Sequence, residues 1–323
     1  MATRTRRWRG VAFGAAALIV GVAVLVASRV SPGQQRPSSQ PSPSAASASA
    51  SASPGFESTG TKPATETLLA VGDVASCDSS ADEAVAAVAA SVDGTIALLG
   101  DNAYPDGSTD DYASCFDPAW GSLRNRIRPA PGNHDYQSSQ AAGYFSYFGS
   151  AAGTPGQGWY SYDLGSWHLI ALNSECDAIG GCGAGSSQLT WLQADLEAHP
   201  ASCTLAYWHH PRYSSGMHGD DTMTDPLWRA LAAAGADVVL SGHDHDYERL
   251  APIDGIREFV VGTGGRSLYA WPGDASAHTE VRANDTYGLL ELQVGASNYT
   301  WRFVRAAGGT FTDTGSGSCH SAL

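Results

Sequence analysis

Five separate segments of the chain place carboxylate, amide or imidazole side chains directly after a short apolar run. The side chains concerned are Asp73, Asp101, Asn133, His134, His209, His210, His243 and His245. Oxygen and nitrogen donors without thiolates are typical of protein sites for iron, manganese or zinc. In GHDH, residues 242–245, alternate side chains of an extended segment point the same way, so both histidines can reach adjacent metals. We interpret the set as a metal site assembled from distant segments.

The second of these segments also holds a tyrosine, Tyr104, three residues after Asp101. Its sequence, GDNAYPDG at residues 100–107, is rich in the Gly, Asp, Asn and Pro that are typical of turns. Such a turn needs no aromatic side chain, so Tyr104 is a candidate member of the same site. The alternative is a packed loop aromatic beside a site for two divalent ions.

The elements that position these residues follow from the hydrophobic pattern. Short apolar runs bounded by turn residues are typical of buried strands, and here they alternate with helical stretches. The pattern occurs at 67–73 then 82–92, at 95–101 then 111–127, at 186–198 then 203–210, and at 225–235 then 236–245. Residues 159–173 and 287–304 alternate around a glycine-containing turn and predict two β-hairpins. Ser186 or Ser187 and Asp225 are expected helix N-caps.

An α/β chain with mixed sheets is therefore expected. In open α/β sheets, ligands bind at the carboxyl ends of strands. The five polar clusters all follow predicted strands or apolar runs, so we expect them to converge on one place.

Taken together, the motifs resemble those of the calcineurin-like metallophosphoesterases and, within them, of the purple acid phosphatases. The matching motifs are VGDV around Asp73, GDNAY at 100–104, GNHD at 132–135, LAYWHH at 205–210 and GHDHDYER at 242–249. The resemblance covers roughly residues 65–306. It implies a four-layer fold, in which two packed mixed β-sheets are flanked by helices and the metal site lies at the C-terminal ends of strands.

The resemblance also implies a ligand set. Most metallophosphoesterases have a histidine two residues after the first aspartate, where this chain has Ala75. In the purple acid phosphatases that histidine is likewise absent, and a tyrosine in the position of Tyr104 replaces it. Metal one is then expected to take Asp73, Asp101, Tyr104 and His245, and metal two Asp101, Asn133, His209 and His243. A phenol bound as phenolate favours a trivalent ion, so the expected cofactors are Fe(III) and a divalent ion, Fe, Zn or Mn.

The chemistry implied is hydrolysis of phosphate monoesters by in-line attack of a metal-bound hydroxide. By the same resemblance, His134 lies beside the phosphate as a transition-state or leaving-group residue, and Asp135 is expected to orient it. His210 and His218 are candidate substrate-side histidines. The remaining histidines are interpreted as structural or solvated, Arg249 as a salt-bridge residue, and GTGG at 262–265 as a tight turn near the site.

Two alternatives stay open at this point. The metal ligands do not exclude a phosphodiesterase or nucleotidase on the same fold. The alternative from another class is a non-catalytic surface protein whose metals are structural. Such a protein would need the same ligands, but it would have no role for His134.

The N-terminal part of the chain indicates export. Residues 1–30 combine four early arginines with an uncharged apolar segment, residues 11–28, and predict a cleaved signal peptide or a signal anchor. Residues 31–64 are rich in Ser, Ala and Pro and predict a disordered linker. Residues 65–323 form the expected catalytic domain, which we place outside the cytoplasm, either secreted or tethered to the membrane.

The net charge bears on which partners to expect, and the cysteine content bears on disulfide formation. All 32 Asp and Glu but only 12 of the 18 Lys and Arg follow Phe56, so the folded part carries 12 minus 32, about −20. Nucleic acid as a bulk partner would require basic surface instead. The partner that the resemblance implies is a small phosphate ester, and the oligomeric state stays open. The six cysteines are even in number without a CxxC spacing, which predicts disulfides, including a small loop closed by Cys176 and Cys182.

Overall fold

The computed structural model describes residues 65–320. The predicted signal segment at 1–30 and the linker at 31–64 lie outside the described residues. Within 65–320, no helix is long and apolar enough to cross a bilayer; the predicted tether at 11–28 is not part of that range.

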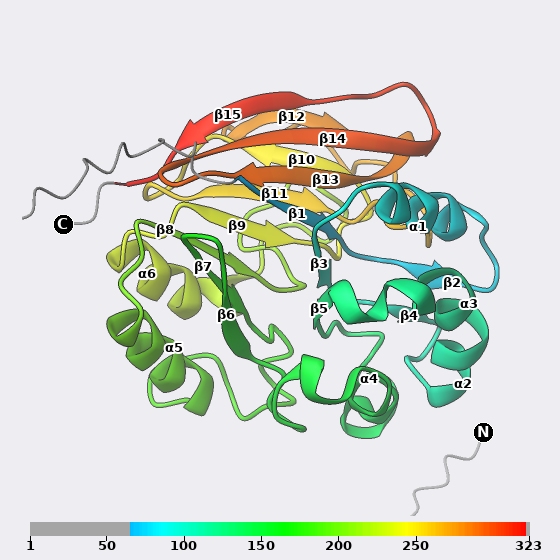
Figure 1. Ribbon diagram of the computed structural model, residues 1–323, viewed down its shortest axis with the longest axis horizontal. Helices are drawn as coiled ribbons and strands as arrows, with labels where there is room; N and C mark the ends of the chain where they lie inside the picture. Colours follow the sequence, from blue (N-terminus) through cyan, green and yellow to red (C-terminus); the bar gives the residue numbers. More distant parts are fainter. Residues whose placement is uncertain (1–64, 321–323) are drawn as a thin grey trace, which may run out of the picture. The chain divides into compact units, whose positions relative to one another are not determined.

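Two mixed β-sheets form the centre of the domain (Figure 1). The first sheet has the order β15-β14-β13-β1-β3-β5, with β1, β3 and β5 parallel. Its strands are β1 (Glu66–Val71), β3 (Thr95–Leu99), β5 (Ile127–Ala130), β13 (Thr286–Val294), β14 (Asn298–Gly308) and β15 (Thr314–Ser318). A small parallel pair, β2 (Ala75–Ser76) and β4 (Ala103–Tyr104), extends from it.

The second sheet has the order β12-β10-β11-β9-β8-β7-β6, with β7, β8, β9 and β11 parallel. Its strands are β6 (Tyr160–Leu164), β7 (Trp167–Ala171), β8 (Cys203–Tyr207), β9 (Val238–Ser241), β10 (Tyr247–Leu250), β11 (Arg257–Val261) and β12 (Thr279–Ala283). The hairpins predicted at 159–173 and 287–304 are confirmed as the antiparallel pairs β6–β7 and β13–β14.

Helices cover the outer faces of both sheets. They are α1 (Ala81–Ser91), α2 (Thr109–Asp111), α3 (Asp117–Trp120), α4 (Ala142–Phe148), α5 (Ser187–Ala198) and α6 (Asp225–Ala233). A short π-helix, η1 (Tyr112–Phe116), and the 3-10 helices η2 (Gly121–Arg126), η3 (Ser139–Ala141), η4 (Gly149–Ala152) and η5 (Thr222–Thr224) lie between them. The single helical stretch predicted at 111–127 is thus divided among several short helices.

The packing has four layers because the strands are apolar on both faces. In β1, Leu68 and Ala70 join the core between the two sheets, whereas Leu69 and Val71 face the helices. That alternation is the two-residue period of a strand. Helices α5 and α6 cover the second sheet, where Leu192 and Trp228 are fully buried. The predicted α/β four-layer fold is confirmed.

Of the two N-cap predictions, one is confirmed and the other is wrong. Ser186 caps α5, since its side chain accepts a hydrogen bond from the backbone N–H of Leu189 at 3.2 Å. The prediction for Asp225 is wrong by one residue: the turn η5 runs into α6, so Thr224 occupies the N-cap and Asp225 is already helical. The carboxylate of Asp225 pairs instead with Arg212 and Arg229.

Three disulfides confirm the prediction made from the cysteines. Cys176 and Cys182 close the small loop, as expected. The other two pairs, which the sequence left undetermined, are Cys77–Cys115 and Cys203–Cys319. The first lies beside β2 and β4, and the second joins the C-terminal segment to the start of β8.

Candidate metal centre

The expected ligands all lie at or just beyond the carboxyl ends of strands. Asp73 follows β1, Asp101 follows β3, Tyr104 ends β4, Asn133 follows β5, His209 follows β8, and His243 and His245 follow β9. Parallel strands end at the same edge of their sheet. Since β1, β3 and β5 belong to one sheet and β8 and β9 to the other, the site lies where the ends of both sheets meet (Figure 1).

One group of side chains surrounds the hydroxyl of Tyr104. This oxygen lies 3.0 Å from Asp73 Oδ1, 2.9 Å from Asp101 Oδ2 and 3.2 Å from His245 Nε2. His245 Nε2 is also 3.2 Å from Asp73 Oδ1. A phenol can donate only one proton, so it cannot satisfy all of these neighbours by hydrogen bonding.

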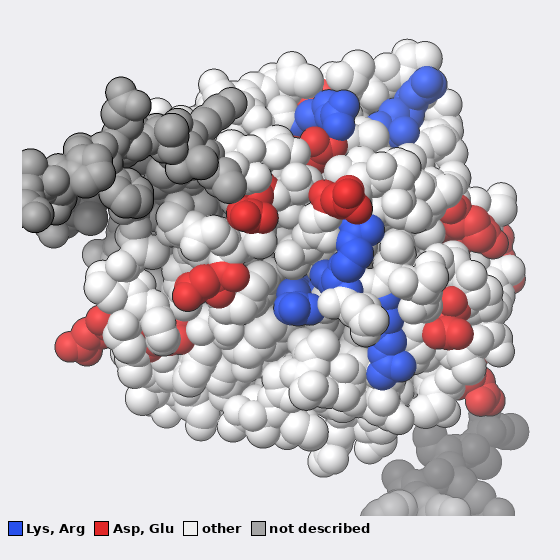
Figure 2. All heavy atoms as spheres, viewed as in Figure 1, with Lys and Arg blue, Asp and Glu red and all other residues white. Residues whose placement is uncertain are grey.

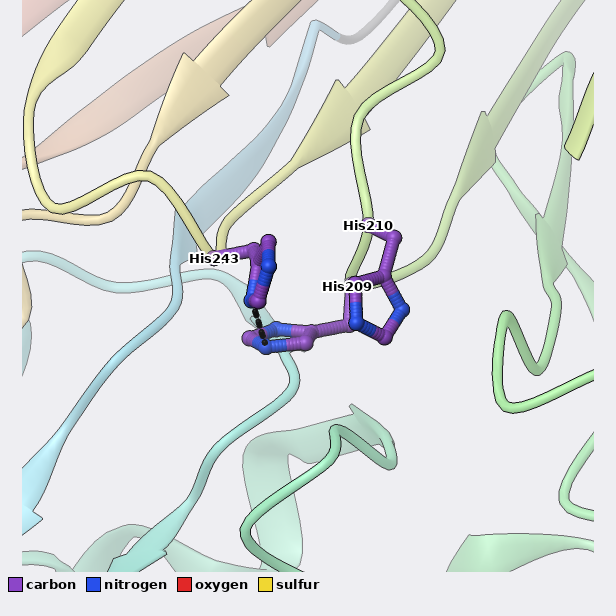
Figure 3. Close-up of side chains that lie close together, drawn as sticks. All are labelled: His209, His210 and His243. Carbon is purple, nitrogen blue, oxygen red and sulfur yellow. Dashed lines mark hydrogen bonds between the residues drawn. The ribbon is translucent and has the colours of Figure 1, made fainter. Parts of the chain in front are cut away.

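A second group surrounds His209 Nε2. This nitrogen lies 3.1 Å from Asn133 Oδ1, 3.3 Å from Asp101 Oδ1 and 3.2 Å from His243 Nδ1. Figure 3 shows His209 and His243 pointing toward each other, with His210 beside them. Asp101 belongs to both groups, through one carboxylate oxygen each.

The donor set fits two metal ions. His209 Nδ1 is 2.9 Å from the carbonyl oxygen of Leu99, which places the ring proton on Nδ1 and leaves a lone pair on Nε2. That lone pair faces the oxygens of Asn133 and Asp101, which are also acceptors. Separations of about 3 Å between acceptors are what metal–ligand distances of about 2.0–2.2 Å produce. A cation in each group resolves these contacts.

The electrostatics of the buried groups agree with that fit. Burial raises the pKa of Tyr104, and the charges of Asp101 and Asp73 raise it further. Burial would lower the pKa of His209, yet Asp101 raises it to about 10, so that without an ion a proton on Nε2 would take the place of the cation. Burial would likewise raise the pKa of Asp101, but His209 and His134 hold it well below its usual range. The carboxylates therefore create a strongly negative potential that favours positive charge.

The local backbone is strained where the ligands sit. Of the six non-glycine residues with positive φ among those described, three are Asp73 at 61°, Asp101 at 51° and His243 at 70°. Such conformations are uncommon for residues with a Cβ and cluster at functional sites. Gly132 allows the close approach of the next segment, since a Cβ there would collide with Asp101 Oδ1.

His134 lies at the edge of the centre, with 31% of its side chain exposed. Its Nδ1 is 2.6 Å from the carbonyl oxygen of Pro105, and its backbone N–H donates to Asp101 Oδ1 at 2.8 Å. The ring packs against Tyr104, with centroids 4.4 Å apart. Nε2 is thereby left free, 3.9 Å from Asp101 Oδ2.

The expectation that Asp135 orients His134 is wrong, because the carboxylate of Asp135 is fully buried and directed elsewhere. It accepts hydrogen bonds from the backbone N–H of Gly132 at 2.9 Å, from Asn102 Nδ2 at 2.9 Å and from the hydroxyl of Tyr112 at 2.7 Å. The carbonyl of Pro105 holds the His134 ring instead. Asp135 therefore fixes the loop that carries Asn133 and His134.

His210 and His218 both lie next to His243, with ring centroids 4.2 Å from it. His210 Nδ1 is turned away, to Ser174 Oγ at 3.0 Å and Glu175 Oε1 at 3.2 Å. Burial, with His209 adding to it, lowers the pKa of His210 to about 3, so this ring is neutral. His218 is exposed, and its backbone N–H is held by Asp244 Oδ1 at 2.7 Å.

Three residues of the site have no counterpart in the sequence predictions. Ser267 Oγ lies 2.8 Å from His245 Nδ1, and the ring of Tyr269 stacks on that of His245 at 4.0 Å. The guanidinium of Arg266 lies 5.2 Å from the ring centroid of Tyr104. Their signal was their position shortly after GTGG. That segment bends at residues 264–266 and lies beside the end of β1, where Gly264 N–H donates to Gly72 O at 3.0 Å.

The interpretation of Arg249 as a salt-bridge residue is confirmed. Its guanidinium pairs with Asp313 at 2.7 Å and with Glu280.

Comparisons with known proteins agree with the fold and the motifs. A family model for calcineurin-like phosphoesterases matches residues 67–247, more than half of the chain. "Purple acid phosphatase 18" of Arabidopsis thaliana is 29% identical over 163 residues, which cover 46% of this chain and 36% of that protein. "Acid phosphatase type 7" of Homo sapiens is 30% identical over 162 residues, which cover 43% of this chain and 35% of that protein. The matches thus span about a third of the length of these relatives.

Among solved structures, purple acid phosphatase PPD1 from yellow lupin seeds superimposes with a TM-score of 0.69. The two sequences are 18% identical, and the alignment covers 80% of this chain and 54% of the lupin chain. Similarity at this level of identity shows a shared fold.

Proposed function

The chain belongs to the calcineurin-like phosphoesterase family, and from this premise we propose that it is a dinuclear metal-dependent phosphatase that hydrolyses phosphate monoesters. The observation that carries the proposal is the sharing of Asp101 between two groups of donors. One group is Asp73, Asp101, Tyr104 and His245; the other is Asp101, Asn133, His209 and His243.

Each group would hold one ion. The proposed pair is Fe(III) beside Tyr104 and a divalent ion, Fe, Zn or Mn, beside His209. When bound, two such ions supply Lewis acidity and a nucleophile formed from water at neutral or acid pH. The two carboxylates and the phenolate only partly neutralise a trivalent and a divalent ion, so the centre would attract a phosphate dianion into an acidic protein.

Residues of the chain supply the other parts of the reaction. His134 Nε2 lies 3.9 Å from Asp101 Oδ2 and has no hydrogen-bond partner among the described residues, since Nδ1 is engaged by the carbonyl oxygen of Pro105. It is the proposed donor to the developing charge of the phosphate or to the leaving alkoxide. His218, exposed beside His243, is the proposed contact for the rest of the substrate, and neutral His210 is a hydrogen-bonding neighbour of the centre.

A location outside the cytoplasm is part of the proposal. The sequence of residues 1–30 and three disulfides within residues 65–320 both support it, since disulfides persist in oxidising compartments. Residues 11–28 are the proposed tether if the signal is retained, and 31–64 the spacer before the catalytic domain at 65–323. The folded part carries a net charge of about −20, which suits a small anionic substrate at a metal centre better than nucleic acid. On the face drawn in Figure 2, basic side chains lie in a short central run and near the top, with acidic side chains between and around them.

The visible absorption spectrum of the purified protein tests the metal assignment. A purple or pink band that disappears in Tyr104→Phe is the expected result, because a tyrosinate bound to Fe(III) gives a charge-transfer transition. A colourless protein that still cleaves phosphate esters would remove iron from the proposal and leave Tyr104 beside two divalent ions.

A substrate panel tests the reaction class. Phosphate monoesters are expected to have the higher kcat/KM. Preference for diesters would establish the phosphodiesterase alternative, and absence of hydrolysis with both metal positions filled would favour a non-catalytic surface protein.

A further inference from the structure

A second group of metal-ligating side chains lies at the opposite end of the second sheet from the proposed centre. His168 is the second residue of β7, in register with Thr204 near the start of β8. Asp195 and His199 lie at the C-terminal end of α5. One ligand atom from each of these three side chains lies within 4.8 Å of the others. His209, by contrast, follows the carboxyl end of β8.

The ring of His168 is held as metal-binding histidines usually are. It is buried, with Nδ1 3.1 Å from Asp163 Oδ1 and Nε2 2.8 Å from Asp195 Oδ2. A histidine ligand usually donates its second ring N–H to a carboxylate, which fixes the tautomer. With the proton on Nδ1 toward Asp163, His168 Nε2 presents a lone pair to a carboxylate oxygen, and a cation between them makes the contact favourable.

The other two side chains complete three protein ligands. Asp195 Oδ1 accepts a hydrogen bond from Ser161 Oγ at 2.8 Å, which fixes the carboxylate and leaves Oδ2 toward His168. His199 Nδ1 is 3.3 Å from Asp195 Oδ1, and its ring stacks on that of His168 at 4.8 Å. Half of the His199 side chain is exposed. Its Nδ1 also lies 3.0 Å from the backbone oxygen of Asp195, and a small rotation of the half-exposed ring would bring a nitrogen to a shared ion.

The surroundings are open to solvent and negatively charged. Two surface hollows, of about 470 and 350 Å³, share His199. The carboxylates of Asp163 and Asp195 carry two negative charges, and Glu197 lines the larger hollow. The residues that line the two hollows include no Lys or Arg. A cation can therefore enter, and the local field attracts it.

We propose that His168, Asp195 and His199 bind one Zn²⁺ ion, with Asp163 orienting His168. Two imidazoles and a carboxylate are ligands that zinc commonly takes, and solvent supplies the remaining position. The ion ties the C-terminus of α5 to the β6–β7 hairpin. The site is separate from the proposed phosphatase centre and stands whether or not that proposal holds. Without an ion, the same contacts would be hydrogen bonds from both ring nitrogens of His168 to the two carboxylates.

Metal content distinguishes these two states. The tag-free full chain is dialysed against Zn²⁺ at defined free concentrations, and bound zinc is measured by mass spectrometry. His199→Ala is expected to bind one zinc per chain fewer than wild type, and Asp163→Asn to bind that zinc about 10- to 100-fold more weakly. His278→Ala, which removes an exposed histidine elsewhere, is the matched control and should leave the zinc content unchanged.

Thermal unfolding gives a second readout. Zn²⁺ should raise the Tm of wild type by more than it raises that of His199→Ala, because binding to the folded state alone stabilises it. Unchanged phosphatase activity and circular dichroism in His199→Ala would show that the loss is local. Equal zinc content and affinity in wild type, His199→Ala and Asp163→Asn would overturn the proposal and leave a structural ion-pair network.

Discussion

Asp101 is the residue on which both halves of the proposed centre depend. Its Oδ2 faces Tyr104, whereas its Oδ1 faces His209 and accepts the backbone N–H of His134. The backbone leaves β3 in a left-handed conformation at this residue, with a φ of 51°, and it is also left-handed at Asp73 after β1. His134, which follows β5, is not one of the proposed ligands. Its Nδ1 contacts the carbonyl oxygen of Pro105, and its Nε2 lies 3.9 Å from Asp101 Oδ2.

Replacing His134 with Ala should therefore lower kcat without removing metal. We expect a loss of about 10²- to 10⁴-fold, the usual contribution of a positioned acid or base. The measurement is steady-state kinetics on a phosphate monoester together with metal content. Asn133→Ala is the comparison, because that change removes a proposed ligand and should lower metal occupancy. Full activity in His134→Ala would contradict the proposed role.

At the scale of elements, the N-terminus of α1 packs behind the centre. Ser79 Oγ donates to Gly265 O at 2.6 Å, and the backbone of Gly265 lies close against Asp82 in the first turn of α1. The adjoining Arg266 N–H donates to Asp73 O at 3.1 Å. The turn after β11 thus links α1 to the end of β1. Asp82 is nearly fully buried there, and its Oδ1 has no hydrogen-bond partner among the described residues.

Replacing Asp82 with Asn should stabilise the protein at high pH more than at low pH. Burial, and then Glu83, raises the pKa of Asp82 from 3.8 to about 7. The folded state keeps a proton that the unfolded state releases, so the stability from this group is full below pH 3.8 and is lost as the pH rises through about 7. We expect a gain of at least about 1 kcal/mol at pH ~8 relative to pH ~4, since each pKa unit corresponds to about 1.4 kcal/mol.

Chemical denaturation at the two pH values measures this gain. Asp93→Asn, an exposed acid just beyond α1, is the control and should show no such difference. The same pH profile in both variants would contradict the assignment to Asp82.

For the molecule as a whole, the C-terminal segment is held beside the N-terminal ends of β8 and β9 in the second sheet. Cys203 begins β8, and its disulfide to Cys319 spans 116 residues. In the same region, Asp237 accepts the backbone N–H of His320 at 2.7 Å and that of Thr204 at 2.9 Å. The proposed phosphatase centre lies at the other end of β8, after Tyr207, so this attachment serves stability.

Removing the Cys203–Cys319 disulfide by double Ala substitution should lower the free energy of unfolding by about 4–5 kcal/mol, because the cross-link restricts a long loop of the unfolded chain. The kcat of the folded variant should be retained. Removal of Cys176–Cys182, which spans only 6 residues, should cost about 2 kcal/mol and is the matched control. Equal losses measured by denaturant unfolding would show that loop length does not govern the effect.

Much of the site was predictable because its residues follow strands that the hydrophobic pattern reveals. The types and order of Asp73, Asp101, Asn133, His209 and His243 were readable in this way, as were both hairpins and the mixed α/β sheets, whereas the four-layer fold was implied by the resemblance to the metallophosphoesterases. The missed features are contacts between segments. The position of Asp135 beside His134 suggested an orienting role that the structure does not show. Arg266 follows a glycine-rich segment, and the sequence does not specify which residues that segment contacts.

The sequence by itself determined which donor atoms are available, that they follow buried strands, and that the cysteines pair. The tertiary structure alone decided which oxygen of Asp101 faces each group, that Pro105 rather than Asp135 holds His134, and that Cys203 meets Cys319. It also decided that His168, Asp195 and His199 lie together. Hydrophobic period and turn chemistry act over a few residues along the chain, whereas these contacts depend on how two sheets pack and in which direction each side chain then points.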